Sequence, residues 1–167
     1  SNVEGGVAWS NTSAASVAGG DFASVELLAG ESSEWLMASA FDFTIPRGST
    51  IDGITAEYET SATLTASARA AGVRLTVAGM LRGISRALSI VHWLLAWTYV
   101  TAGTQNDRWE ESFKGRDVNA SDFGIAIRVT IDGVLPTDAH IRHIRMTIHY
   151  TLPIQTGYTT GTAVVGA

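Results

Sequence analysis

Apolar and polar residues alternate along five stretches of this chain, and a period of two is the pattern of half-buried β-strands. In the first stretch, Phe41, Phe43 and Ile45 would share one face of a strand. The stretches are residues 41–45, 51–59, 73–77, 125–131 and 139–152. With shorter apolar runs, they give about eight strands at a spacing of roughly 8–12 residues. We therefore predict an all-β fold, a jelly-roll-like antiparallel β-sandwich with extended N- and C-terminal arms.

The two ends of the chain lack this alternation, which divides the sequence into three regions. Residues 1–20 are small and polar apart from Trp9, and we expect an N-terminal arm and first edge strand that Trp9 pins. Residues 21–152 form the predicted sandwich, and Pro153 ends its last strand because proline has no N–H to donate. Residues 153–167 are predicted to be a flexible tail or an arm laid on a neighbour. The N-terminal residues have no basic start and no apolar run, so we expect no signal peptide.

Residues 80–100 fit two different patterns. A helix would place on one face Ile84, Leu88, Val91 and Leu95. A pair of strands would instead align Trp93, Leu95, Trp97 and Tyr99. The β-rich context favours strands, and a short helix stays open as the alternative.

The same region is the most hydrophobic part of the sequence. The run 84–100 is interrupted by polar residues and is shorter than the roughly 20 residues that span a bilayer. We therefore expect no membrane span, and interpret the run as a buried strand or a subunit interface. The candidate interface residues are Ile84, Leu88, Val91, Trp93, Leu94 and Trp97.

Composition narrows the class of protein. The chain has 167 residues, 46% of them hydrophobic, which is enough for a packed core and argues against disorder. The net charge of -5 argues against nucleic-acid binding, which favours a basic surface. The sequence has no cysteine, which excludes disulfides, thiolate metal sites and cysteine nucleophiles.

Side chains with catalytic or metal-binding chemistry are scattered. His143 and His149 would share one strand face about 20 Å apart, with His140 on the opposite face, too far apart to share one metal ion. Glu57 and Glu59 would place their carboxylates about 7 Å apart, as in some glycosidases, although a solvated face is the simpler interpretation. The sequence has no nucleophile-elbow, P-loop or dinucleotide-binding motif. We predict no enzymatic activity, no metal and no cofactor.

The sequence also has five tryptophans, and exposed aromatic rings can stack on sugars. Trp109 follows the polar residues 105–108, so Trp109, with Asp107 beside it, is the best candidate for ligand stacking. Core packing or a subunit interface explains tryptophans equally well, and we expect Trp109 to be buried.

Several phrases stand in a fixed order between residues 9 and 152. They are WSN at 9–11, FDFTIPRGSTIDGI at 41–54, VRL at 73–75, WTYVTAG at 97–103, DRW at 107–109, DVNASDFGI at 117–125 and HIRHIRMTIHY at 140–150. Together they resemble a β-sandwich domain of tailed-phage structural proteins and prophage-like genes. The phrases suit turns and strands: Phe123 would fill the core and Gly124 would leave room at the start of a strand. Residues 80–96 depart from the resemblance, because an apolar run replaces the usual polar hairpin.

The resemblance implies a structural protein of the virion, assembled in the host cytoplasm, and implies no catalytic residue. We expect a capsid decoration or cement protein, a homotrimer that contacts the major capsid protein or other virion proteins. The alternative is a carbohydrate- or receptor-binding module of a tail fibre, tail tip or head spike, whose partner is a host surface glycan. Neither reading involves nucleic acid or a membrane.

Overall fold

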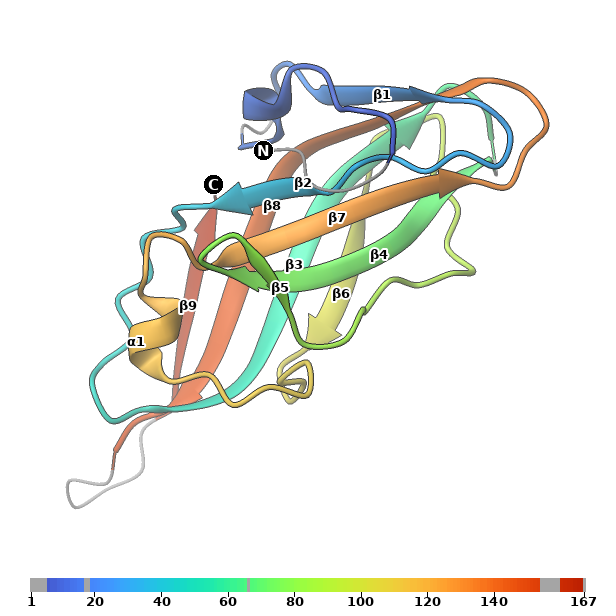
Figure 1. The fold of residues 1–167 in the computed structure, drawn as a ribbon. Coiled ribbons are helices and arrows are strands. Elements are labelled where there is room, and N and C mark those ends of the chain that lie inside the picture. The colour runs from blue at the N-terminus through green and yellow to red at the C-terminus, as the bar shows by residue number, and fades with distance from the viewer. Residues whose placement is uncertain (1–5, 17–18, 66, 154–159, 167) are drawn as a thin grey trace.

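Two antiparallel sheets pack face to face in the computed structural model, which describes residues 6–16, 19–65, 67–153 and 160–166 (Figure 1). One sheet contains β1 (Ala23–Leu27), β8 (Thr137–Thr151), β3 (Thr50–Ala62) and β6 (Thr98–Thr104), with β9 (Thr160–Gly166) also paired to β8. The other contains β2 (Leu36–Ser39), β7 (Gly124–Ile131), β4 (Ala68–Val77) and β5 (Met80–Arg82). The prediction of an all-β antiparallel sandwich is confirmed. No helix in the described residues is long and apolar enough to cross a membrane.

The core between the sheets follows the predicted alternation. Ile54, Ala56 and Tyr58 of β3 point inward and are almost completely buried. Phe123 is also buried, and Gly124 begins β7 where a Cβ atom would lie 2.0 Å from the Ala38 carbonyl oxygen. Only glycine therefore fits at this position, as the sequence predicts.

Strand β8 changes its pairing partner along one edge, and the alternation of its inward and outward side chains shifts by one residue in the middle. Its first half pairs with β1 and its second half with β9, while β3 runs along the opposite edge. A bulge lies between these halves at His143, whose φ is 46°. Because the bulge inserts one residue, the alternation restarts after it. His140 and His149 therefore both lie on the outer face, which corrects the prediction that they point to opposite faces.

The segment 41–45 is not a strand, although its three apolar side chains are buried as predicted. Ala40 and Asp42 have φ of 63° and 54°, which is incompatible with a regular strand. Instead of a neighbouring strand, Ile45 bonds a side chain: its N–H donates to Asn119 Oδ1 at 2.8 Å, and its carbonyl accepts from Asn119 Nδ2 at 2.9 Å. Residues 46–49 then form the expected turn, in which Ser49 N–H donates to the Pro46 carbonyl.

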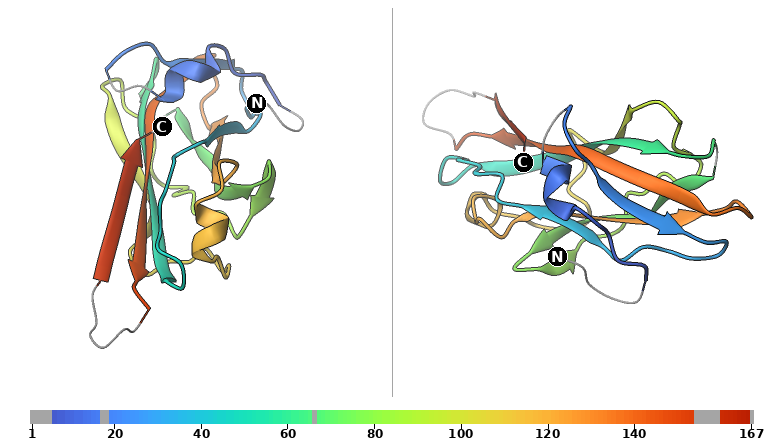
Figure 2. Two further views of the ribbon diagram at one scale, coloured as in Figure 1. Left: turned by 90° about the vertical axis from the view of Figure 1, so that its left-hand side faces the viewer. Right: turned by 90° about the horizontal axis from the view of Figure 1, so that it is seen from above.

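Both ends of the described chain pack on the chain's own sandwich (Figure 2). Near the N-terminus, a 3₁₀ helix spans Thr12–Ser16, and Trp9 is buried with its indole N–H donating to the Glu34 carbonyl at 3.0 Å. Trp9 thus anchors the described residues near the N-terminus to the core. At the other end, β9 lies in the region predicted as a flexible tail, yet residues 160–166 pair with β8. Residues 154–159 of that predicted tail lie outside the described part.

Candidate functional site

The segment 83–97 connects β5 of one sheet to β6 of the other along one side of the sandwich, yellow-green in Figure 1. It is neither the predicted strand pair nor the alternative helix. Its backbone bonds the free edge of β4: Arg86 N–H donates to the Val73 carbonyl and Trp93 N–H to the Ala68 carbonyl, each at 2.8 Å. The segment covers this edge at separate points, without the continuous ladder of a strand.

Side-chain contacts fix the same segment further. The Arg86 guanidinium donates two hydrogen bonds to the Asp107 carboxylate, at 2.6 and 2.7 Å. His92 lies 3.2 Å from an Asp132 carboxylate oxygen. The backbone of the segment is therefore held at several points along its length.

Several apolar side chains of this pinned segment face solvent. Ile90 is 87% exposed and Leu95 is 60% exposed. Of the twelve large hydrophobic residues that are exposed in the described chain, five fall within residues 84–95. They are Ile84, Leu88, Ile90, Leu94 and Leu95. A series of exposed apolar side chains on a backbone held by hydrogen bonds is typical of a contact surface.

The predicted interface residues divide between this surface and the core. Ile84, Leu88 and Leu94 are exposed and belong to the surface. Val91 is partly buried, and Trp93 is only 1% exposed, because its backbone pairs with β4 and its ring enters the core. Trp97 is half-buried under the Arg142 guanidinium, so it belongs to the outer face of the β3 sheet. The predicted interface residues did not include Ile90 and Leu95, which are the two most exposed side chains of this surface. The segment is neither a strand nor a helix, so neither periodicity indicates which of its side chains face solvent.

Trp109 and Asp107, the candidates for ligand stacking, have internal roles. Trp109 is completely buried, and its indole N–H donates to the Ile54 carbonyl at 2.9 Å, so the ring cannot stack on a sugar. Asp107 accepts from Arg86 and from the Trp109 backbone N–H. Burial alone raises the pKa of Asp107, but these hydrogen bonds and the Arg86 charge outweigh it and hold the pKa below its usual value.

The two glutamates considered as a catalytic pair each form an ion pair on the outer face. Glu57 accepts two hydrogen bonds from Arg145, both at 2.8 Å, and Glu59 accepts two from Arg142, at 2.8 and 3.2 Å. In both pairs the two carboxylate oxygens accept from one guanidinium. Each glutamate therefore has an arginine as its direct partner, and neither lies beside the other as an unpaired carboxylate.

Each of these arginines also lies over an aromatic ring. The Arg142 guanidinium carbon lies 4.0 Å from the centre of the Trp97 ring, and that of Arg145 lies 4.6 Å from the centre of Tyr99. The Tyr99 hydroxyl forms a hydrogen bond with His143 Nδ1. Stacked guanidinium groups of this kind order both the ring and the ion pair.

The histidines of β8 bond separate partners. His140 lies 3.2 Å from Ser61 Oγ, and His149 lies 3.2 Å from Thr55 Oγ1. Within the described ranges, no three histidine, aspartate or glutamate side chains gather as a metal ion would require.

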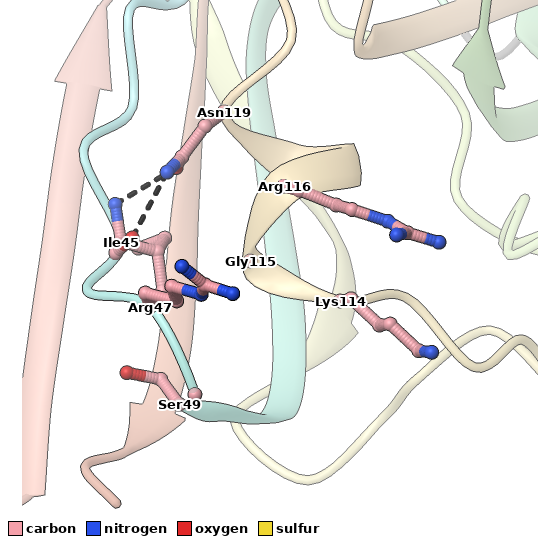
Figure 3. Close-up of a pocket in the computed structure, with 8 residues that line it drawn as sticks. Ile45, Arg47, Ser49, Lys114, Gly115, Arg116 and Asn119 are labelled. Carbon is pink, nitrogen blue, oxygen red and sulfur yellow. Dashed lines mark hydrogen bonds between the residues drawn. The ribbon is translucent and has the colours of Figure 1, made fainter.

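A cavity of about 700 Å³ lies at the end of the sandwich next to α1, a short helix over Gly115–Val118 (Figure 3). Its lining includes three basic side chains from two distant parts of the sequence: Arg47 from the turn before β3, and Lys114 and Arg116 at α1. Figure 3 shows Arg47 extending from its turn toward α1, while the side chains of Lys114 and Arg116 leave α1 in the direction away from Arg47. Sequence reasoning missed this site, because the residues are separate in the chain and no motif links them.

The basic cavity has no acidic lining residue, and its walls are tied together. The lining residues are Ile45, Arg47, Gly48, Ser49, Lys114, Gly115, Arg116 and Asn119. The two hydrogen bonds between Asn119 and the Ile45 backbone join one wall to the other (Figure 3). A backbone bridge between Thr50 and Lys114 joins them again.

Comparisons with protein-family models, with curated proteins and with solved structures find no match to this chain.

Proposed function

We propose that this protein is a non-enzymatic structural protein of a tailed-phage virion, and most specifically a capsid decoration or cement protein. The exposed apolar surface of residues 84–95 carries the proposal. Burying one such side chain against a partner contributes about 1.5–3 kcal/mol, so several together support a stable contact. The partner is the major capsid protein or a further copy of this chain in a trimer on the shell.

Three further observations support a structural role. The phrases quoted above resemble phage structural domains, and Phe123 and Gly124 have the fold-keeping positions that the resemblance implies. The glutamate pair forms ion pairs with arginines, and Trp109 is buried. The receptor-binding alternative thereby loses the residue that was its best stacking candidate.

The decisive experiment is the copy number of this protein in purified particles, measured by quantitative mass spectrometry against the major coat protein. A capsid decoration protein is expected at hundreds of copies per particle. A few to a few tens of copies would contradict decoration and favour a tail or neck location. Absence from particles would contradict the whole proposal.

A matched pair of variants tests the surface itself. Ile90→Ser removes an 87% exposed side chain from the surface, whereas Val134→Ser removes an 86% exposed side chain elsewhere. Both variants should keep the wild-type circular dichroism spectrum. We expect Ile90→Ser to lower the copy number per particle and Val134→Ser to leave it unchanged. Equal incorporation of the two variants would show that residues 84–95 do not hold the protein on the particle.

A further inference from the structure

Strand β6 forms one edge of its sheet, and the outer side of this strand is unpaired. Among the described residues, β6 pairs only with β3, from Thr98 to Thr104 (Figure 1). The free edge of β4 in the other sheet is covered by the segment 83–97. No described residue bonds the outer edge of β6 between Thr98 and Gly103. An exposed strand edge of this kind is able to pair with a further strand.

The backbone of β6 presents its unpaired groups at every second residue. Ile54 and Ala62 of β3 direct their N–H groups to the β6 side, where each donates to a carbonyl just outside β6 at 2.9 Å. Because this direction alternates along an antiparallel strand, the even-numbered residues of β3 and β6 bond one another. The odd-numbered residues Tyr99, Thr101 and Gly103 therefore direct their N–H and C=O groups away from β3. The hydrogen-bond partners of these groups have to come from another strand or from water.

A groove runs along this free edge. It consists of two hollows of about 510 and 320 Å³, lined on one side by residues 101–104 and 98–101 respectively. Side chains of successive strand residues alternate between the two faces, so an unbroken run of lining residues means that the groove follows the backbone edge. The opposite wall is formed by residues 85–88 and 91–94 of the segment 83–97, where Leu88 lines both hollows. The free edge and the apolar surface are thus neighbours.

The sequence of β6 suits pairing with a copy of itself. Residues 98–104 read TYVTAGT, in which five of the seven residues are β-branched or aromatic and none is charged or proline. Edge strands that avoid association commonly carry a charge or a proline. In a twofold pairing any charge on the edge would face its like, and β6 has none. The ionic side chains beside the groove are compensated within the chain, since Arg86 pairs with Asp107 and His92 lies 3.2 Å from Asp132.

We propose that β6 pairs with β6 of a second copy of this chain, antiparallel about a twofold axis at Thr101. Thr101 is the middle residue of the strand, so this register pairs all seven residues and brings the odd-numbered backbone groups of the two copies opposite one another. A twofold axis perpendicular to the sheet also places both 83–97 segments on the same face of the joined sheet. The exposed side chains beside each groove, Leu88 and Leu94, are then buried between the copies in a self-complementary contact.

Sedimentation velocity of the full chain over a range of protein concentrations tests the pairing, and we expect a reversible dimer. Thr101→Pro removes an N–H that points away from β3, so the fold should be kept. The dimer loses two hydrogen bonds, one from each copy, and its dissociation constant should rise at least about tenfold. Thr101→Ala keeps the N–H and should change the dissociation constant less than about threefold. A dimer equally tight in the two variants would contradict the proposal.

Thr101→Lys covers the case in which proline disturbs β6 itself. The lysine keeps every backbone group, but the two copies would place like charges opposite each other at the axis. Thr162→Lys adds the same charge at an exposed position of β9, on the other side of the same sheet. The dissociation constant should rise at least about fivefold in Thr101→Lys and change less than about twofold in Thr162→Lys. Equal effects of the two lysines would show that the response is to net charge and not to pairing of β6.

A single cysteine locates the axis. The sequence has no cysteine, so Thr101→Cys supplies the only thiol of the chain. In the proposed register the two Cα atoms lie about 5.5 Å apart, within the range of about 4.4–6.8 Å that disulfides need. Mild oxidation should link most of the Thr101→Cys protein into dimers and leave Thr162→Cys mainly unlinked. Linking of Thr162→Cys alone, or of both variants to the same extent, would overturn the assignment of the contact to β6.

The oligomeric state also separates this inference from the proposed virion role, on which it does not rest. A trimer would overturn the twofold pairing and support the trimer on the shell proposed above. A monomer would overturn the pairing too, and would leave the apolar surface to the major capsid protein. The copy number per particle tests the virion role whichever of these states is found.

Discussion

Replacing Gly103 by alanine should break the buried contact that holds Trp109 in the core. Gly103 of β6 has φ of 77°, and a Cβ atom there would lie 2.3 Å from the Ile54 carbonyl oxygen and 2.7 Å from Trp109 Nε1. These two atoms form the buried 2.9 Å hydrogen bond of the Trp109 indole. A methyl group at this place cannot coexist with that bond, so the indole must move.

The expected cost of Gly103→Ala has three parts. The left-handed backbone costs an L-residue about 1–2 kcal/mol. Loss of the buried hydrogen bond costs about 1–3 kcal/mol, and forcing the ring against its neighbours costs about 1–3 kcal/mol. Alanine recovers about 0.4–1 kcal/mol by restricting the unfolded chain. We therefore expect the free energy of unfolding to fall by about 4 kcal/mol, a large part of the about 5–15 kcal/mol of a typical domain.

Gly79→Ala is the control that isolates the backbone cost. Gly79 lies in the turn between β4 and β5 with φ of 73°, and no atom lies within 4 Å of the position its Cβ would take. It should cost about 1 kcal/mol, from backbone conformation alone. Urea unfolding followed by tryptophan fluorescence compares the two variants. A difference of less than about 1 kcal/mol between them would refute the steric argument.

Three further predictions concern other parts of the molecule. Ile90→Ser should change the free energy of unfolding by less than about 0.5 kcal/mol, whereas Trp93→Ala should lower it by about 3–5 kcal/mol. Urea unfolding measures both changes. Equal losses of stability in the two variants would contradict the assignment of Ile90 to the surface and Trp93 to the core. The pKa of Asp107 is held low in the folded protein, so the stability that it contributes is present above about pH 4 and is lost as the pH falls through its folded pKa. The stability difference between wild type and Asp107→Asn should therefore shrink below about pH 4, and a constant difference would contradict the ion pair. Burial lowers the pKa of His140, so NMR should show its imidazole titrating below about 6.5, and stability should fall as the pH drops from about 6.5 through that value.

The sequence predicts the parts of the fold in which side-chain alternation and backbone pairing agree. In residues 51–59 the inward face was predicted correctly, because β3 pairs with β8 along this length and with β6 from Ile54 onward. In residues 41–45 the alternation is real, but the backbone is bonded by the Asn119 side chain from 74 residues further along the chain. A local pattern reports which side chains are buried, and it does not report what bonds the backbone.

The candidate sites were less predictable, because each depends on residues brought together by the fold. The pairing of Glu57 with Arg145 requires the register of β3 on β8, and the bulge at His143 sets that register. Arg47 and Lys114 are 67 residues apart in sequence, and only the fold places them around one cavity. The apolar run at 80–96 was recognised from the sequence, but the prediction of its secondary structure was wrong. Its exposed side chains were therefore only partly identified.

The exposed apolar side chains within residues 84–95 are not explained by the packing of this chain's own core. The backbone of the 83–97 segment covers the edge of β4, and polar side chains would allow the same hydrogen bonds. Trp93 alone enters the core as a fully buried side chain of the segment, so Ile90 and Leu95 could be polar without loss of internal packing. Apolar side chains at these two positions lower solubility and do not contribute to the packing of the isolated chain. This favours a contact with another molecule.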